Sequence, residues 1–281
     1  MSSTFWLTTL AMVAFAGNSI LARLALGDGA IDAAGYTGVR LASGAAVLAL
    51  LLVNANRKSA PTVRLPGGWT SALALFVYAV AFSYAYLQLG AAVGALVLFA
   101  SVQATMIAWG LIRGERPGLS EIAGLTIAFA AFVYWIAPAL VTPALLGTVL
   151  MIASGVAWGV YSLRGRAATD SMGETAGNFI RTVPLAIPLI ALSAFQSGMT
   201  TAGIVIAIAS GAVTSGLGYV LWYRALPGLT ATRASIVQLT VPVIAALGGV
   251  LFLAEALTLR FVLAATLILG GIALALLVRK R

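Results

Sequence analysis

Residues 92–112 read AVGALVLFASVQATMIAWGLI, an apolar run without a charged side chain, and RGERPG follows at 113–118. The hydrocarbon core of a bilayer is about 30 Å thick, and a helix of about 20 apolar residues crosses it. A spanning strand would instead need about ten residues of alternating polarity. A helix also satisfies its own backbone where lipid offers no hydrogen-bond partner. The run therefore predicts a transmembrane helix that ends in a charged turn.

The composition of the whole chain agrees with this prediction. Of the 281 residues, 62% are apolar and 8% are charged, and the mean hydropathy is +1.07. Soluble domains are about 45–50% apolar and about 25% charged. The net charge of +9 is divided among the loops between apolar runs and forms no basic face, so nucleic acid is not an expected partner. We predict an all-α polytopic membrane protein whose surroundings are a lipid bilayer.

Ten apolar segments alternate with loops that contain glycine, proline or charged residues. Each is long enough, or nearly so, to cross the membrane as a helix. The segments are 5–26, 34–53, 69–89, 92–112, 122–137, 145–163, 176–195, 202–223, 230–253 and 259–278.

Lysine and arginine are divided unevenly between the two predicted sides of the membrane. Cytoplasmic loops of membrane proteins carry an excess of these residues. With both termini in the cytoplasm, the outer side receives only Arg23, Arg40 and Arg260. The inner side receives Arg57, Lys58, Arg64, Arg113, Arg116, Arg164, Arg166, Arg181, Arg224, Arg233, Arg279, Lys280 and Arg281. We therefore predict cytoplasmic termini, with every cationic side chain within about one and a half turns of a membrane face.

Several features of the first half recur about 140 residues later. Each half contains five segments, so the second copy, 141–281, crosses the membrane in the opposite sense to the first, 1–140. Inverted repeats are common in secondary transporters, where the substrate site lies near the midplane between the copies. The recurring pairs are Arg113-Gly-Glu115 with Leu253-Ala-Glu255, the Gly35–Arg40 stretch with Gly177–Arg181, and Ala16-Gly17 with Trp158-Gly159.

These residues resemble the EamA-type drug/metabolite transporter superfamily. The resemblance rests on the arginine early in the second helix of each half, the glutamate after the fourth helix, the stretch Trp222-Tyr-Arg-Ala-Leu-Pro-Gly, and Pro242 before Glu255. Within the superfamily the chain looks most like the YddG-type exporters of aromatic amino acids. Val102 departs from the pattern, because it stands where the second half has Pro242.

The resemblance implies a multi-pass protein of the bacterial inner membrane that acts as a monomer without a cofactor. Its expected function is export of aromatic or other neutral amino acids and related small metabolites by alternating access. A broad-specificity exporter of neutral metabolites or drugs is the alternative. Sugar phosphates and other phosphorylated anions are less expected, because they need cationic side chains inside the cavity.

Neutral polar and aromatic side chains near the middle of the segments are candidates for substrate binding. Polar groups there need a partner helix or a wet cavity, because leaving them unpaired in lipid is costly. An aromatic zwitterion could stack its ring on such side chains, and its carboxylate could accept hydrogen bonds from the amides. The same residues could instead serve helix packing. The candidates are Asn18, Tyr78, Phe82, Phe99, Gln103, Trp158, Tyr161 and Gln238.

All acidic residues lie at segment ends or in loops, and histidine and cysteine are absent. Ion-coupled transporters usually keep an ionisable side chain within the membrane for the coupling ion, so we expect facilitated transport. No metal site and no catalytic dyad can be assembled, which argues against an enzyme. A channel with a neutral pore remains open on these grounds.

Two kinds of residue are candidates for gating. Arg40 and Glu255 on the outer side, and Arg181 and Glu115 on the inner side, would form ion pairs that break as the cavity opens. The alternative is that these charges fix the depth of the helices in the membrane. Gly90, Gly94 and Pro242 are candidate hinges, because small residues and proline loosen helix packing.

Overall fold

The computed structural model describes residues 3–56, 65–139, 144–196, 198–252 and 255–277. Within these ranges the regular structure is helical, apart from an isolated bridge between Ile31 and Met199. The main helices are α1 (Ser3–Ala22), α2 (Ala33–Asn56), α3 (Trp69–Ile112), α4 (Leu119–Ile136), α5 (Leu145–Gly165), α6 (Ser171–Phe195), α7 (Thr201–Ala209), α8 (Gly218–Ala225), α9 (Ala231–Val237), α10 (Thr240–Phe252) and α11 (Leu259–Leu277).

Some features of the prediction fall outside the described residues. They are the cations Arg57, Lys58, Arg64, Arg279, Lys280 and Arg281, the residues Leu253 and Ala254 of the repeated ending, and the boundary at residue 140.

In the part of the chain that is described, nine helical stretches are long and apolar enough to cross a membrane. The α7–α8 stretch, Thr201–Gly228, and the α9–α10 stretch, Ala231–Phe252, each count as one of them. This arrangement confirms an all-helical, polytopic membrane protein. The number differs from the ten predicted segments because 69–89 and 92–112 fall in one element, α3.

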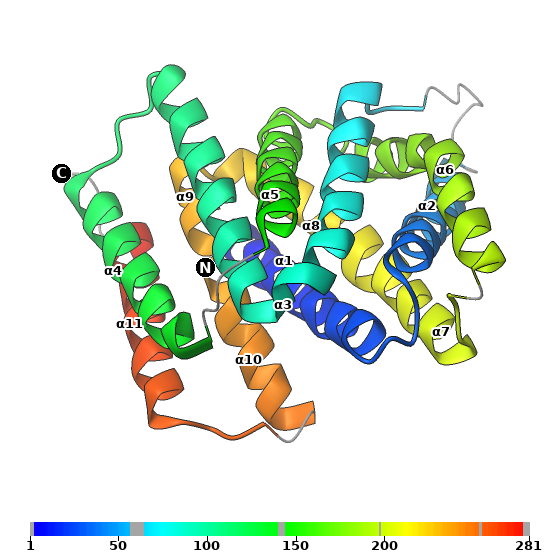
Figure 1. Cartoon of the computed structure of the whole chain (residues 1–281). Coiled ribbons are helices and arrows are strands. Elements are labelled where there is room, and N and C mark those ends of the chain that lie inside the picture. Colours follow the sequence, from blue (N-terminus) through cyan, green and yellow to red (C-terminus); the bar gives the residue numbers. More distant parts are fainter. Residues whose placement is uncertain (1–2, 57–64, 140–143, 197, 253–254, 278–281) are drawn as a thin grey trace.

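The helix α3 is bent sharply at Gly90. Its 44 residues would extend about 66 Å if straight, more than twice the thickness of a hydrocarbon core. Gly90 has φ 68° and ψ −179°, a conformation that only glycine adopts readily. Figure 1 shows the two parts of α3 diverging from the bend like the arms of a V. Helix α5 packs against both arms, since Ser154 Oγ donates to the carbonyl of Tyr78 and Gly155 lies against Ser101.

Helices α7 and α8 are joined by a π-helical stretch, Ser210–Leu217, which is wider than an α-helix. It packs closely on α2, because Gly211 lies against the backbone of Arg40. Within this stretch Ser210 Oγ and Tyr36 Oη are 2.9 Å apart, and Ser215 Oγ accepts a hydrogen bond from Arg40. The π-helical stretch thus presents its serine hydroxyls to the interior of the bundle.

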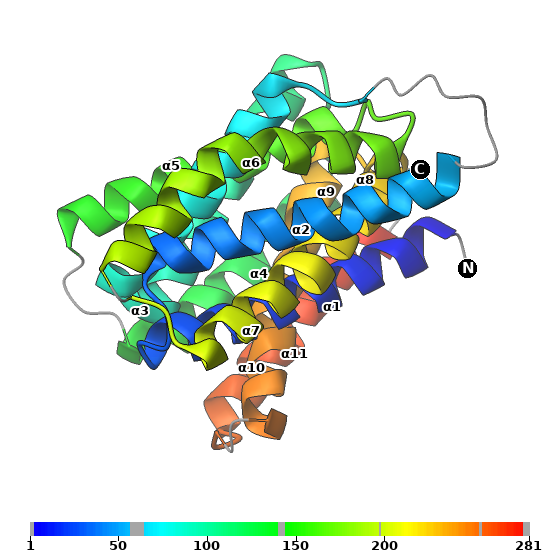
Figure 2. The same cartoon turned by 90° about the vertical axis from the view of Figure 1, so that its right-hand side faces the viewer.

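The bundle has two ends. At the terminal end, the start of α1 lies beside the turn before α9, where Thr4 contacts Gly228. The carboxyl end of α11 lies at the same end, because Ala275 packs on Gly124 near the start of α4. Figure 2 shows the start of α1 and the end of α11 toward the right-hand side. At the opposite end, called the far end, Ser193 Oγ donates to Asp32 Oδ2 at 2.8 Å.

Most of the described arginines named in the prediction lie at one of these two ends. Arg113, Arg164, Arg166, Arg181 and Arg233 lie at the terminal end. Arg23 and Arg260 lie at the far end, where they contact Glu255 and the carbonyl of Tyr134. Arg40 departs from the prediction and lies in the interior of the bundle, as described below.

Candidate functional site

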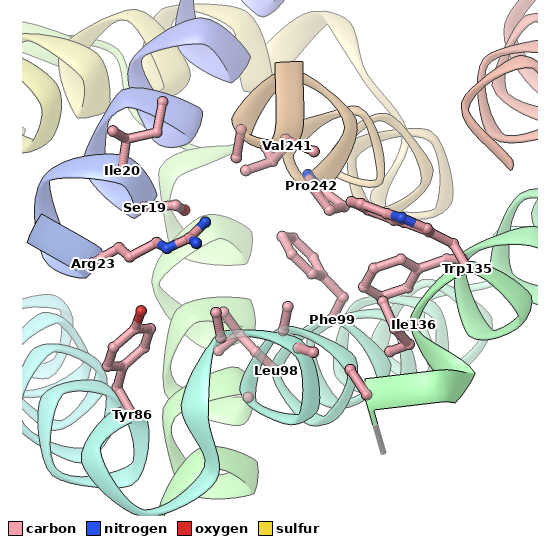
Figure 3. Close-up of a pocket in the computed structure, with 18 of the residues that line it drawn as sticks. Ser19, Ile20, Arg23, Tyr86, Leu98, Phe99, Trp135, Ile136, Val241 and Pro242 are labelled. Atoms are coloured by element: carbon pink, nitrogen blue, oxygen red, sulfur yellow. The ribbon is translucent and has the colours of Figure 1, made fainter. Parts of the chain in front are cut away.

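A cavity of about 320 Å³ lies between α1, α3, α4, α5 and α10. Figure 3 shows its walls: Ser19 and Ile20 from α1, Tyr86, Leu98 and Phe99 from α3, Trp135 and Ile136 from α4, and Val241 and Pro242 from α10. The side chain of Arg23 extends toward the centre of the cavity (Figure 3). Glu255 also lines the cavity, and it forms an ion pair with Arg23. Because both side chains are partly exposed at the far end, the rim of the cavity lies there.

A smaller recess of about 40 Å³ adjoins this cavity deeper in the bundle. The two spaces share the lining residues Ser19, Phe82, Leu98, Phe99 and Val241. The recess is otherwise lined by Phe15, Asn18, Tyr78, Val102, Trp158, Tyr219 and Gln238. A ligand that enters from the far end would therefore meet an apolar cavity first and a more polar recess second.

The structure brings most of the predicted site residues together. Asn18, Tyr78, Phe82, Phe99, Trp158 and Gln238 all line the recess. Gln103 and Tyr161 line neither space. Gln103 is buried, and its Nε2 atom has no hydrogen-bond partner among the described residues. Tyr161 is fully buried and stacks on Trp158 with ring centroids 5.7 Å apart, so it supports the wall from behind.

Trp158 is at the centre of an aromatic cluster. Its ring packs on Phe15, Tyr78 and Tyr219 with centroids 5.2, 4.8 and 4.8 Å away. Its indole Nε1 donates to Gln238 Oε1 at 2.7 Å. The amide nitrogen of Gln238 donates in turn to the carbonyl of Ala234 at 2.9 Å. The polar groups of Trp158 and Gln238 are therefore hydrogen-bonded to each other. What the pair mainly offers to the recess is the surface of the indole ring.

Phe15 and Tyr219 line the recess although they are not among the predicted site residues. Tyr219 lies four positions from Ser215, so the two share a face of the helix. Ser215 is a polar residue near the middle of the predicted segment 202–223, so its position was a signal for Tyr219. Phe15 lies three positions before Asn18 and could have been found by the same spacing.

Arg40 lies inside the bundle with only 1% of its surface exposed. Its Nε donates to Ser215 Oγ at 2.8 Å, and its Nη2 donates to Tyr219 Oη at 2.6 Å and to Tyr78 Oη at 3.4 Å. The predicted position of Arg40 at a membrane face beside Glu255 is thus wrong for this structure. Arg40 is two turns inside α2, and the hydroxyls of neighbouring helices hold its side chain inward. The interior of the bundle therefore contains a charged side chain.

Ion pairs occur at both ends, but with other arginines than predicted. At the far end Glu255 pairs with Arg23, not Arg40. At the terminal end Glu115 pairs with Arg166 at 3.0 Å, whereas Arg181 donates to the carbonyls of the 65–66 stretch. Arg23 and Arg166 are separated by the repeat offset of about 140 residues, as are the two glutamates, and this spacing could have revealed them.

Glu115 and two arginines make further contacts at the terminal end. Its carboxylate accepts hydrogen bonds from the backbone nitrogens of Ala231 and Thr232, at 2.9 and 3.3 Å, at the start of α9. Arg166 Nε donates to the carbonyl of Leu229 at 3.2 Å. A second ion pair joins Arg233 to the buried Glu121 at 2.7 Å. These contacts tie α3, α4 and α5 to the start of α9.

The fold is that of a multi-pass membrane protein with an internal cavity, and comparison with known proteins shows what it is similar to. The EamA-like transporter family matches residues 145–277. An uncharacterized protein of Pseudomonas aeruginosa is 50% identical over 273 residues, which cover 97% of this chain and 94% of that protein. An uncharacterized transporter of Archaeoglobus fulgidus is 28% identical, with 74% and 77% covered. The second half of the chain thus matches the EamA-like transporter family, and the matches together support membership of the drug/metabolite transporter superfamily.

A crystal structure of another protein has the same fold, with a TM-score of 0.82 at 21% identity. The match covers 100% of this chain and 99% of the other. The match to the EamA-like transporter family points to transport and not to enzymatic catalysis.

Proposed function

We propose that this protein exports aromatic or other neutral amino acids and related small metabolites by alternating access. The observation that carries the proposal is the difference between the two ends of the bundle. The cavity has its rim at the far end, beside Arg23 and Glu255, whereas Glu115 and Arg166 tie the helices together at the terminal end. A transporter needs such a one-sided cavity in each of its two states.

In this proposal α3 makes two spans that meet at Gly90, giving ten spans in two inverted repeats, 1–140 and 141–281. The excess of arginine at the terminal end supports cytoplasmic termini in a bacterial inner membrane. The cavity then faces the outside, and the structure corresponds to an outward-open state of a monomeric exporter related to the YddG type.

The repeat also suggests how the second state forms. Glu115 and Glu255 are equivalent in the two halves, as are Arg166 and Arg23. In this structure Glu115 accepts hydrogen bonds from the start of α9. The equivalent place in the first half is the second arm of α3, where Ala91 and Ala92 line the cavity together with Glu255. In the inward-open state Glu255 binds that helix start, and Glu115 releases α9.

The lining of the cavity supports a small cargo with an aromatic or apolar side chain. A volume of about 320 Å³ lies at the lower end of the range for small-molecule sites, about 300–1,000 Å³. Ring contacts with residues such as Phe82, Phe99 and Trp135 contribute about 0.5–1.5 kcal/mol each beyond burial of area. Contact energies of this size favour release of the cargo. The largely apolar wall also supports the alternative, a broad-specificity exporter of neutral metabolites.

Facilitated movement is favoured over proton coupling, because none of the residues that line the recess is acidic. Glu255 lines the outer cavity, but Arg23 neutralises it.

The test is transport by the purified protein in proteoliposomes. Labelled tryptophan, phenylalanine and threonine are loaded on one side, and counterflow is measured with and without a pH gradient. We expect saturable counterflow of the aromatic amino acids without a requirement for the gradient. Equal transport of unrelated neutral drugs would favour the alternative, and single-channel currents would indicate a channel.

A further inference from the structure

Two side chains that line the recess carry hydrogen-bond donors with no acceptor among the described residues. Asn18 Oδ1 accepts from Ser210 Oγ at 2.7 Å, while the amide nitrogen of Asn18 donates to none of the described residues. Tyr78 Oη accepts from Arg40 and from Tyr219, both at 3.4 Å. The proton of the Tyr78 hydroxyl has no acceptor in the described part of the chain. Both Asn18 and Tyr78 line the recess.

Arg40 adds an uncompensated positive charge directly behind these donors. It forms no ion pair with any described acid, and its three hydrogen bonds go to the neutral hydroxyls of Ser215, Tyr219 and Tyr78. Its Nη1 is buried and has no partner among the described residues. Burying a guanidinium without an anion is unfavourable, and within a membrane such residues generally mark a site of function.

We propose that the recess binds the carboxylate of the cargo, with Asn18 and Tyr78 as donors and Arg40 as the charge that it neutralises. The inference rests on the proposed function and specifies which part of the cargo the recess recognises. The recess, at about 40 Å³, has room for a group of a few atoms, while the rest of the cargo occupies the larger cavity. Arg40 acts as a positioning residue, because it polarises the hydroxyls of Tyr219 and Tyr78.

One positive charge matches a monoanion better than a phosphate. Arg23, the other cation near the cavity, is already neutralised by Glu255. A carboxylate also accepts several hydrogen bonds at once, which fits a recess with several free donors. The ammonium group of a zwitterion can then remain over the aromatic faces that surround the recess.

The experiment compares ligands that differ only in the carboxylate. Binding of phenylalanine and of phenylalaninamide is measured by ligand-induced thermal shift and by inhibition of counterflow in proteoliposomes. The wild-type protein should bind phenylalanine about tenfold or more tightly than the amide, the effect of one charge-assisted hydrogen-bond network. Equal binding of the two would overturn the proposal, as would a chloride-induced thermal shift as large as that of phenylalanine.

Three variants locate the effect. Tyr219→Phe removes the hydroxyl that Arg40 binds, whereas Tyr223→Phe, one turn further along α8, removes a hydroxyl that donates to the carbonyl of Tyr161. Tyr219→Phe should weaken phenylalanine binding severalfold and leave amide binding unchanged, and Tyr223→Phe should change neither. If Tyr219→Phe weakens both ligands equally, the proposal fails. Arg40→Gln should abolish the preference for the carboxylate, and the other measurements remain decisive if that variant does not fold.

The proposed function and the carboxylate site can fail separately. If no amino acid is transported but indole-3-acetate binds in a manner that depends on Tyr219, the amino-acid function fails and the carboxylate site stands. If phenylalanine and its amide are transported equally well, the function stands and the carboxylate site fails.

Discussion

Trp158 donates its indole hydrogen to Gln238 Oε1 across 2.7 Å, and this bond joins α5 to the residue that follows α9. It crosses the recess wall between helices that are distant in sequence. The bond therefore couples the shape of the recess to the position of α9, whose first turn is held by Glu115 at the terminal end.

Trp158→Phe should destabilise the protein by about 1–3 kcal/mol, because the substitution leaves a buried amide oxygen without its donor. It should also weaken binding of aromatic cargo, since the wall loses its largest ring. Trp222→Phe is the matched control, because Trp222 is fully buried and donates to Ser162 Oγ at 3.0 Å without lining the recess. Thermal unfolding and cargo binding are measured for both variants, and only Trp158→Phe should lose cargo binding. A loss of binding in Trp222→Phe as large as that in Trp158→Phe would contradict the prediction.

Glu115→Gln should loosen the terminal end and so disfavour the proposed outward-open state, because it removes an ion pair and weakens the cap on α9. Cysteine is absent from the chain, so a single introduced thiol reports accessibility cleanly. Ser235→Cys, at a buried position in α9, should be labelled faster from the terminal end when combined with Glu115→Gln.

The control for that measurement is Glu174→Gln, which alters an exposed hydrogen bond to Thr169 in the loop before α6. It should leave labelling of Ser235→Cys unchanged. Unchanged labelling in Glu115→Gln as well would mean that Glu115 does not hold the terminal end closed.

Arg23 and Glu255 should be weakly coupled. Their side chains are 46% and 32% exposed, so solvent screens the pair. A double-mutant cycle with Arg23→Ala and Glu255→Ala should give a coupling free energy below about 1 kcal/mol but above zero. Arg260→Ala is the comparison, because Arg260 binds the carbonyl of Tyr134, and its cycle with Glu255→Ala should give no coupling. Coupling of equal size in both cycles would indicate a general charge effect and no specific pair.

Gly90→Ala should destabilise the protein by about 1–3 kcal/mol through the backbone alone. The space around Gly90 is open, since no neighbouring atom lies within 4 Å of the position that a methyl group would take, and its φ of 68° is the cause of the strain. Gly270→Ala in α11 is the control, because it is equally open and has no positive φ. It should leave stability unchanged or raise it slightly. Equal effects of the two substitutions in thermal unfolding would mean that the bend tolerates a side chain.

The helical architecture followed from the sequence because lipid permits few alternatives. The predicted segment 145–163, for example, corresponds to the helix Leu145–Gly165. The predicted start at 176 was late, because the polar first turn of α6 resembles a loop, although Asp170 caps it by accepting from the nitrogen of Gly173. Gly90 was predicted to be a hinge and stays so as a prediction; the strained bend that the structure has there could not be read from the residue type alone.

The site was harder to predict than the spans. Depth in the membrane grouped Asn18, Tyr78, Trp158 and Gln238 as candidates, and the structure places all four around one recess. It failed for Arg40, because an arginine near a helix end can point its long side chain toward water or toward the core. Arg40 points inward because hydroxyls distant in sequence bind its side chain, namely Tyr78 on α3, Ser215 in the π-helical stretch and Tyr219 on α8.

The π-helical stretch Ser210–Leu217 makes the recess sensitive to the winding of one helix as well as to its residue types. An α-helix advances about 100° with each residue and the wider π-helix advances less, so everything that follows would be rotated if these 8 residues formed an ordinary α-helix. Tyr219 would turn away from Arg40 and Trp158, and Trp222 would turn away from Ser162, with every side chain still present. A relative without the π-helical winding would therefore present a different recess to its cargo, even with the same residues at these positions.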